Sequence, residues 1–264
     1  MWNSSKVHVH LGLEKPIRIL HLTDIHIVLA NDDESDAHKA FAAWRQPVFD
    51  VSGSTPSQLL EEALDYGKSF DCTVITGDVV DNVSQGNFDE MRRIFKDRDF
   101  MFCIGNHEYL QVERHQVRTH ECIAAKEEMW DELQSIFKHD IGFDSRIVGG
   151  VNLITVDNAL LAWTKDIYEK FQAEVAKGYP ILVFSHAPVE CCTERYRGHL
   201  QRYGYTEEEI ELSFKITEYL GNEPMIKGFF AGHCHMYKDA PFHGKPNYWA
   251  GALFNRELTE ITID

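Results

Sequence analysis

The residues of this chain that could do chemistry lie in five short polar motifs, each directly after an apolar, strand-like run. Their side chains are Asp, Asn and His, which supply the oxygen and nitrogen atoms that bind hard to borderline divalent cations. Several such motifs in one chain, each at a strand end, predict a metal site. The motifs are Asp24-Ile25-His26, Gly77-Asp78-Val79-Val80-Asp81, Gly105-Asn106-His107-Glu108, the lone His186 after Ile181–Ser185, and Gly232-His233-Cys234-His235.

Taken singly, each motif also has an ordinary structural explanation. Asp24 could cap a helix, the pair Gly77-Asp78 could form a turn, and His186 could be a buried histidine with satisfied hydrogen bonds. The joint occurrence of the motifs, in this order and always at strand ends, favours the metal site.

The spacing within the motifs indicates how two cations could be held. A pair of ions about 3.5–4 Å apart needs a bridging ligand, and the carboxylate of Asp78 has two oxygens and follows a strand directly. Asp24 and His26 are two residues apart, so on an extended segment they would point the same way. His233 and His235 repeat that spacing.

The surrounding elements are predicted to alternate between strands and helices, and to become mainly strands near the end. In open α/β sheets, ligands gather beyond the carboxyl ends of strands, where all five motifs fall. No linker divides the chain, so we expect a single domain over residues 1–264.

Thr206 is the expected N-cap of one helix, and residues 27–56 are expected to form a long irregular loop. The expected strands are 6–11 in a hairpin with 17–23, then 72–76, 100–104, 151–156, 181–184, 225–230, 247–253 and 258–263, and the expected helices are 57–68, 88–96, 118–138, 163–177 and 207–220.

Composition excludes several classes of protein. The formal net charge of −16 argues against a broad surface that grips nucleic acid through its phosphates. No apolar run approaches the length that crosses a membrane, and the first residues carry no secretory signal, so we expect a cytoplasmic protein. Six cysteines without a CxxC pair, among them the adjacent Cys191 and Cys192, are expected to be reduced thiols.

The ordered set of motifs resembles the pattern of the calcineurin-like metallophosphoesterase superfamily, which is DxH, GDxxD, GNH[DE], a lone H and GHxH. The resemblance covers about residues 17 to 235. It implies an α/β fold, a four-layer α/β/β/α sandwich of two mixed β-sheets flanked by helices. It also implies two metal ions with Asp78 as the bridge. The ligands so implied are Asp24, His26, Asp78 and His235 for the first ion, and Asp78, Asn106, His186 and His233 for the second.

The resemblance implies a hydrolase of phosphomonoesters or phosphodiesters. A hydroxide that bridges the metals would attack phosphorus in line, His107 would protonate the leaving oxygen, and Asp81 would orient His107. A histidine suits proton transfer near neutral pH. Mn²⁺ is the first expectation for the two divalent ions, with iron or zinc as alternatives, because all suit this nitrogen and oxygen set.

Departures from the family pattern narrow the substrate. Asn82 stands where phosphoprotein phosphatases carry an arginine that holds phosphate, and Asp81 stands where purple acid phosphatases carry a metal-binding tyrosine. A small-molecule or nucleotide substrate remains possible, and its specificity is expected to come from insertions near 27–56, 108–146 and 190–222. The stretch 190–205 is basic and aromatic, and could contact a phosphate or a base, or could equally be a solvated helix face.

Two other readings stay open. One is a metal-dependent nuclease, and the other is a protein-binding scaffold of the same fold without catalysis. The charge disfavours the nuclease, and the complete set of motifs disfavours the scaffold. The substrate and the oligomeric state are not fixed by these patterns.

Overall fold

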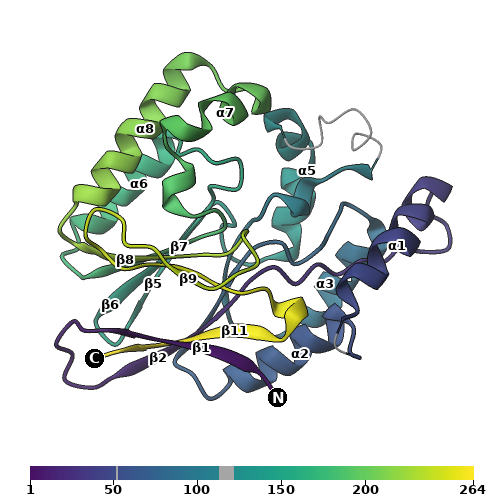
Figure 1. Cartoon of the computed structure of the whole chain (residues 1–264), viewed down its shortest axis with the longest axis horizontal. Helices are drawn as coiled ribbons and strands as arrows, with labels where there is room; N and C mark the ends of the chain where they lie inside the picture. The colour runs from purple at the N-terminus through teal and green to yellow at the C-terminus, as the bar shows by residue number, and fades with distance from the viewer. Residues whose placement is uncertain (52, 113–121) are drawn as a thin grey trace.

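The computed structural model describes residues 1–51, 53–112 and 122–264, and its framework is two β-sheets packed face to face. Figure 1 shows the strands of one sheet below those of the other, with helices outside both. The first sheet has the order β1-β11-β2-β3-β4, and the second has the order β5-β6-β7-β8-β10-β9. The strands are β1 Asn3–Val9, β2 Ile17–Leu22, β3 Cys72–Thr76, β4 Met101–Cys103, β5 Phe143–Val148, β6 Val151–Val156, β7 Ile181–Ser185, β8 Ile226–Ala231, β9 Lys238–Asp239, β10 Asn247–Trp249 and β11 Glu257–Ile263.

Helices cover the outer face of each sheet. Apolar side chains of α2, α3 and α5 form one core with strands β2, β3 and β4, and those of α6 and α8 form another with β6, β7 and β8. A third core lies between the two sheets. The helices are α1 Asp36–Phe49, α2 Pro56–Gly67, α3 Gln85–Phe95, α5 Ile123–Ile136, α6 Lys165–Val175, α7 Arg197–Tyr203 and α8 Glu207–Asn222, with short 3₁₀ turns η1 His107–Tyr109, η2 Val189–Cys191, η3 Glu194–Tyr196 and η4 Leu253–Asn255.

The core between the sheets explains why the sandwich forms. Inward-facing residues of the first sheet, such as Ile19 and Val74, meet inward-facing residues of the second, such as Leu182 and Phe184, and all are at most 1% exposed. Because both faces of the central strands are covered, those strands are mostly apolar rather than strictly alternating. The predicted four-layer α/β/β/α sandwich is confirmed, with mixed parallel and antiparallel pairing in both sheets.

Several sequence predictions of local structure are confirmed to the residue, and others are wrong. The strands at 72–76 and 151–156 have the expected bounds. Thr206 caps α8 with a capping box completed by Glu209, as expected, although the helix runs past Gly221 to Asn222. The predicted hairpin of 6–11 with 17–23 is wrong, because β11 inserts between β1 and β2 and pairs with both.

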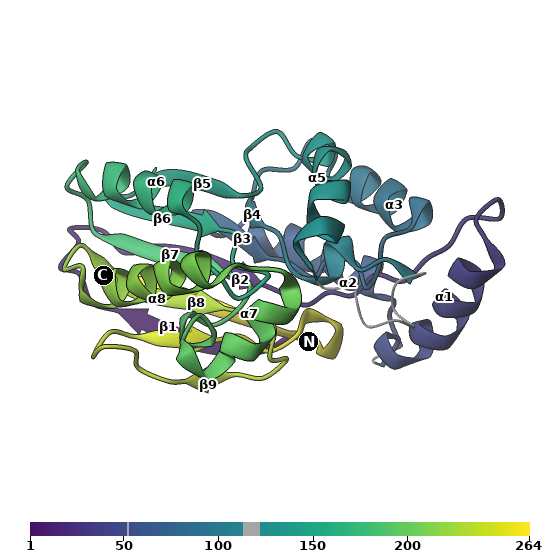
Figure 2. The ribbon, with the colours of Figure 1, turned by 90° about the horizontal axis from the view of Figure 1, so that it is seen from above.

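The segment 27–56 is also corrected, because it contains the fourteen-residue helix α1 rather than an irregular loop alone. Ser35 caps this helix by accepting the backbone N–H of His38. Figure 2 shows α1 at one end of the molecule, beyond α2 and α3. The expected start of the helix at 118–138 lies outside the described residues, and the described part begins at Ile123.

Among the residues that the structure describes, no helix is both long and apolar enough to cross a bilayer. Cys191 and Cys192 are two thiols rather than a vicinal disulfide, as expected.

Candidate metal centre

The loops after β2 and β3 run side by side and hold the first two motifs together. The backbone N–H of Asp24 donates to the carbonyl of Gly77 at 3.1 Å, and that of His26 donates to the carbonyl of Asp78 at 3.0 Å. The Asp24 carboxylate also accepts the backbone N–H of His233 at 2.9 Å. Three of the five motifs are therefore joined by hydrogen bonds, two between backbones and one through the Asp24 carboxylate.

Five of the seven predicted ligands have left-handed backbone conformations rather than extended ones. Aspartate and histidine are among the non-glycine residues that tolerate this region best. The expectation that Asp24 and His26 share a side because the chain is extended is therefore wrong in its reason, although the two side chains do come together. The positive φ angles are 53° at Asp24, 56° at His26, 51° at Asp78, 68° at His233 and 53° at His235.

Two motif glycines are needed because neighbouring atoms leave no room for a Cβ. Gly77 has a φ of +76°, and a Cβ there would collide with the backbone of Gly105. A Cβ on Gly232 would collide with the side chain of Thr23. Any larger residue at either place would push two ligand loops apart.

The first group of donors consists of Asp24, His26, Asp78 and His235, whose ligand atoms lie within 4.8 Å of one another. The Nε2 atom of His26 is 3.1 Å from Nε2 of His235 and 3.8 Å from Oδ2 of Asp78. The Nδ1 atom of His26 faces Oδ1 of Asp81 at 3.0 Å. Since a carboxylate only accepts, this Nδ1 carries the hydrogen and the neutral ring turns a lone pair on Nε2 toward the group.

The second group consists of Asp78, Asn106, His186 and His233. The Nδ1 atom of His186 donates to the carbonyl of Thr76 at 2.8 Å. Its Nε2 atom then faces Oδ1 of Asn106 at 2.9 Å, Nδ1 of His233 at 3.1 Å and Oδ2 of Asp78 at 3.3 Å. Ligand atoms about 2.1 Å from one ion at right angles lie roughly 3 Å apart, so both groups fit divalent cations, with Asp78 belonging to each.

The electrostatics of these groups reflect several buried acids close together. Burial disfavours the charged ring of His186, but Asp78 beside it raises the pKa of this imidazole to about 9. Burial likewise acts to raise the pKa of Asp78, yet His186 and His107 hold it well below its usual range. The carboxylates thus require positive charge next to them, and protons or metal cations can provide it.

His107 lies at the edge of the same centre and is fixed by Asp81. Its Nδ1 atom is 2.8 Å from the carbonyl of Asp81 and 3.1 Å from Oδ1 of that residue. Burial acts to lower the pKa of His107, but the Asp78 and Asp81 carboxylates outweigh it and raise the pKa to about 10. The backbone N–H of His107 also donates to Oδ1 of Asp78 at 2.9 Å, which ties this residue to the shared carboxylate.

All nine residues singled out from the sequence, the seven donors together with His107 and Asp81, are thus brought to one place. Three further residues touch the centre: Glu108, a motif residue to which the sequence assigned no role, and two residues that sequence reasoning missed. Glu108 is fully buried and accepts the backbone N–H groups of Asp78 at 2.9 Å and Gly105 at 2.6 Å, which joins two ligand loops.

The two missed residues, Arg45 and Phe49, come from helix α1. The Arg45 guanidinium donates to both oxygens of Asp81, and the Phe49 ring stacks on His26 with centroids 4.6 Å apart and planes within 3°. A signal for them existed in the sequence. Phe41, Arg45 and Phe49 are spaced by four residues, which places them on one face of a helix, and the structure confirms that helix.

The basic and aromatic stretch 190–205 contributes less positive charge than its composition suggests. Arg197 donates to Glu194 at 2.7 Å and to two further carboxylates, Glu207 and Glu211. Its charge is therefore neutralised locally, which supports the solvated-face reading for this residue.

Comparison with known proteins agrees with the fold. A family model described as calcineurin-like phosphoesterase matches residues 17–237. Among solved structures, a dimetal phosphatase from Danio rerio is similar at 12% identity, over 93% of this chain and 92% of that chain, with a TM-score of 0.53. A purple acid phosphatase from yellow lupin seeds is similar at 13% identity, over 93% of this chain and 45% of that chain, also with a TM-score of 0.53. No curated protein sequence matches the chain.

Proposed function

Because the chain belongs to the calcineurin-like phosphoesterase family, we propose that it is a dinuclear metal-dependent hydrolase of phosphoric esters. The proposed substrate is a small molecule or nucleotide with a phosphomonoester or phosphodiester bond. The observation that carries the proposal is the convergence of the oxygen and nitrogen donors of five loops around Asp78, with His107 beside them. The net charge of −16 supports a small substrate over a long nucleic acid.

Seven side chains would hold the cations, with Mn²⁺ as our first choice and iron or zinc as alternatives. When bound, two such cations supply Lewis-acid chemistry: they lower the pKa of a water molecule and neutralise charge on phosphoryl oxygens. Asp24, His26 and His235 would share Asp78 with Asn106, His186 and His233. The Oδ2 atom of Asp78 lies 3.8 Å from Nε2 of His26 and 3.3 Å from Nε2 of His186, so it reaches both groups.

His107 is the proposed proton donor to the leaving oxygen. Its Nδ1 atom is occupied by Asp81, which leaves Nε2 for the substrate. The two carboxylates beside it raise its pKa to about 10 and keep the ring protonated at neutral pH. Cations at Asp78 would offset part of that shift and bring the pKa closer to the working pH, where a general acid is most efficient.

A substrate panel on metal-loaded protein tests the proposal. Chelator-treated protein is reloaded with Mn²⁺, and aryl phosphomonoesters, aryl phosphodiesters and cyclic nucleotides are offered at neutral pH. We expect turnover of at least one class, which chelator abolishes. His107→Ala should lower kcat by about 10²- to 10⁴-fold, the usual contribution of a general acid.

A matched control is His8→Ala, because His8 is an exposed histidine on β1 at the edge of the first sheet. It should leave the rate unchanged. Two bound cations per chain without turnover of any ester would reject the hydrolase and favour the scaffold reading. Cleavage restricted to single-stranded DNA would favour the nuclease.

A further inference from the structure

The carboxylate of Asp81 is the meeting point of three cationic or donor groups, of which the sequence motifs supply only two. Its Oδ1 atom lies 3.0 Å from Nδ1 of His26 and 3.1 Å from Nδ1 of His107. Arg45 adds a two-pronged contact, with Nη2 2.8 Å from Oδ1 and Nε 2.7 Å from Oδ2. The Asp81 side chain is completely buried.

The orientation and the charge compensation of the Asp81 carboxylate both depend on the Arg45 guanidinium. A bidentate pair fixes both oxygens in one plane, whereas two imidazoles on a single oxygen leave the carboxylate able to turn. A buried ion pair that loses one partner also leaves an uncompensated charge. Without Arg45, the direction in which Oδ1 points toward His107 would be set less firmly.

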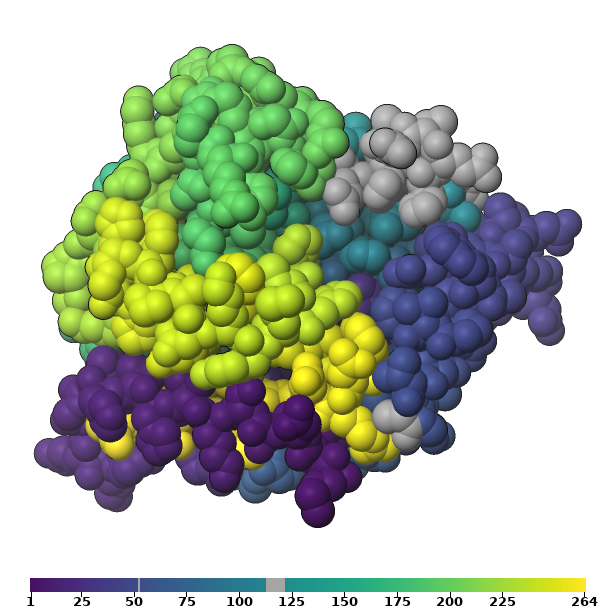
Figure 3. Space-filling model, viewed as in Figure 1, coloured from purple at the N-terminus to yellow at the C-terminus, as the bar shows by residue number. Residues whose placement is uncertain are grey.

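The position of Arg45 is itself fixed by helix α1. The guanidinium lies over the Phe49 ring at 4.9 Å, and Phe49 packs against Phe254 with ring centroids 5.0 Å apart. One turn before Arg45, the buried Phe41 packs with Leu110 and Val112. In the space-filling view, the α1 segment forms one edge of the molecule next to the C-terminal segment in yellow (Figure 3).

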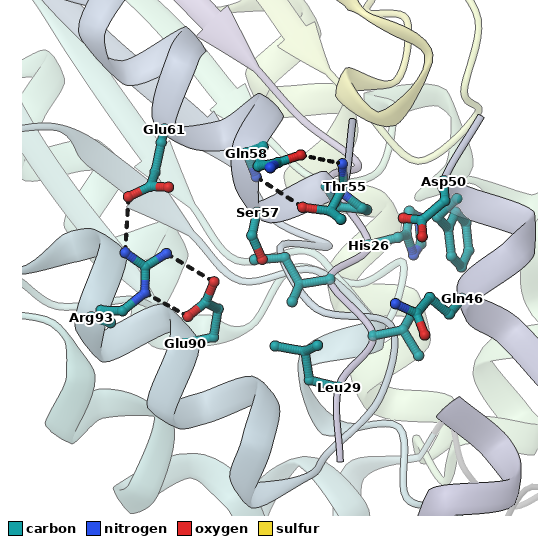
Figure 4. Close-up of a pocket in the computed structure, with 14 residues that line it drawn as sticks. His26, Leu29, Gln46, Asp50, Thr55, Ser57, Gln58, Glu61, Glu90 and Arg93 are labelled. Atoms are coloured by element: carbon teal, nitrogen blue, oxygen red, sulfur yellow. Dashed lines mark hydrogen bonds and ion pairs between the residues drawn. The ribbon is translucent and has the colours of Figure 1, made fainter. Parts of the chain in front are cut away.

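A cavity lies beside α1, between this helix and helices α2 and α3. It has a volume of about 220 Å³ and is lined by His26, Phe49 and residues of α2 and α3. Figure 4 shows that Arg93, a basic residue of its lining, pairs with Glu61 and Glu90. Arg45 does not line this cavity. The basic group that α1 brings to the metal centre is therefore directed at Asp81.

We propose that Arg45 is a positioning residue for catalysis, which acts through Asp81 to hold His107 in the orientation that protonates the leaving oxygen. This inference rests on the proposed function. It makes α1 part of the catalytic apparatus rather than a cover over it. The positive charge beside the GDxxD loop, which carries Asn82 in place of an arginine, then comes from a separate helix.

The test compares two esters whose leaving groups differ in their need for a proton. A 4-nitrophenyl ester releases a stable anion, while an alkyl ester of the same phosphoryl group requires protonation. Arg45→Ala should lower kcat for the alkyl ester by about 10- to 100-fold, part of what a general acid contributes, and that for the nitrophenyl ester by less than about 3-fold. KM should stay within about 2-fold, and Arg45→Lys or added guanidinium should restore part of the rate.

A double-variant cycle separates this role from a merely structural one. If Arg45 acts through His107, then Arg45→Ala should cost little on a His107→Ala background. Arg93→Ala is the matched control, because Arg93 makes a similar two-pronged pair with Glu90 away from Asp81, and it should leave both rates unchanged. Equal losses for both esters, equal losses on both backgrounds, or a change confined to KM would overturn the proposal.

A spectroscopic measurement on cation-free protein decides the matter independently of turnover. The hydrogen-bonded Nδ1 protons of His26 and His107 should give proton NMR signals, which His107→Ala assigns. Arg45→Ala should shift or broaden the His107 signal, and Arg93→Ala should not. An unmoved signal would overturn the positioning role, and absence of turnover in the parent protein with a moved signal would reject only the proposed function.

Discussion

His21 offers a quantitative test of how the sandwich depends on pH. This histidine of β2 is 1% exposed and lies between the two sheets, edge-on to Phe184 with ring centroids 5.6 Å apart. Its Nε2 atom is 2.8 Å from the hydroxyl of Thr76. Burial lowers the pKa of His21 from 6.5 to about 3, although Asp24 nearby acts to raise it.

The sign of the effect on stability follows from where the proton binds. Between about pH 3 and 6.5 the unfolded chain protonates His21 and the folded chain does not. Stability contributed by the neutral ring is therefore complete above pH 6.5 and is lost as the pH falls. From pH 7.5 to pH 5, with one pKa unit worth about 1.4 kcal/mol, the loss amounts to about 2 kcal/mol.

Urea unfolding of the parent and of His21→Gln at the two pH values measures this loss, with chelator present so that cation binding does not contribute. The glutamine keeps a polar group near the Thr76 hydroxyl but does not titrate. We expect the parent to lose about 2 kcal/mol more than the variant between pH 7.5 and pH 5. Each protein serves as its own reference, so a constant packing cost in the variant cancels. Equal losses in the two proteins would refute the reasoning.

Three further outcomes are expected. Asp78→Asn should remove most activity and lower the number of cations bound per chain, measured by metal analysis, because both donor groups share this carboxylate. A near-normal rate would refute the bridging role of Asp78, and Asp33→Asn, which changes an exposed acid, is the control. Mn²⁺ at 100 times its dissociation constant should stabilise the protein by about 2.7 kcal/mol for one site. This stabilisation should raise the midpoint of thermal unfolding by roughly 5–10 °C, and an unchanged midpoint would count against binding. Gly77→Ala should destabilise the fold by several kcal/mol in urea unfolding, and clearly more than Gly178→Ala. Both glycines have positive φ, but of the two only Gly77 faces another backbone. Equal losses of stability would show that the close approach does not matter.

Much of the framework could be predicted because local pattern and global fold agree there. The strand Cys72–Thr76 is a short run of apolar and β-branched residues between Asp71 and Gly77, so its type and its bounds are both visible. The motif residues were found because each follows such a run. Their types, together with their ordered occurrence at strand ends, indicated metal binding whatever the conformation between them.

Other parts could not be predicted because they depend on distant partners. The pairing of β11 between β1 and β2 joins the two ends of the chain, and no local pattern records it. The sequence marks helix α1 only weakly, because few of its residues are buried and Pro47 lies inside it. The spacing of Phe41, Arg45 and Phe49 indicates one helix face, but the partner of Arg45 could not be predicted, since Asp81 lies 36 residues further along the chain.

The backbone of the metal centre shows why this site depends on the whole sandwich. Left-handed conformations at non-glycine residues cost about 1–3 kcal/mol each, and Asp24, His26, Asp78, His233 and His235 all adopt them. Together they cost on the order of 10 kcal/mol, comparable to the net stability of a typical domain. The turns persist because hydrogen bonds between the loops and the apolar core between the sheets over-determine them. The donors are thus held facing one another by the fold itself.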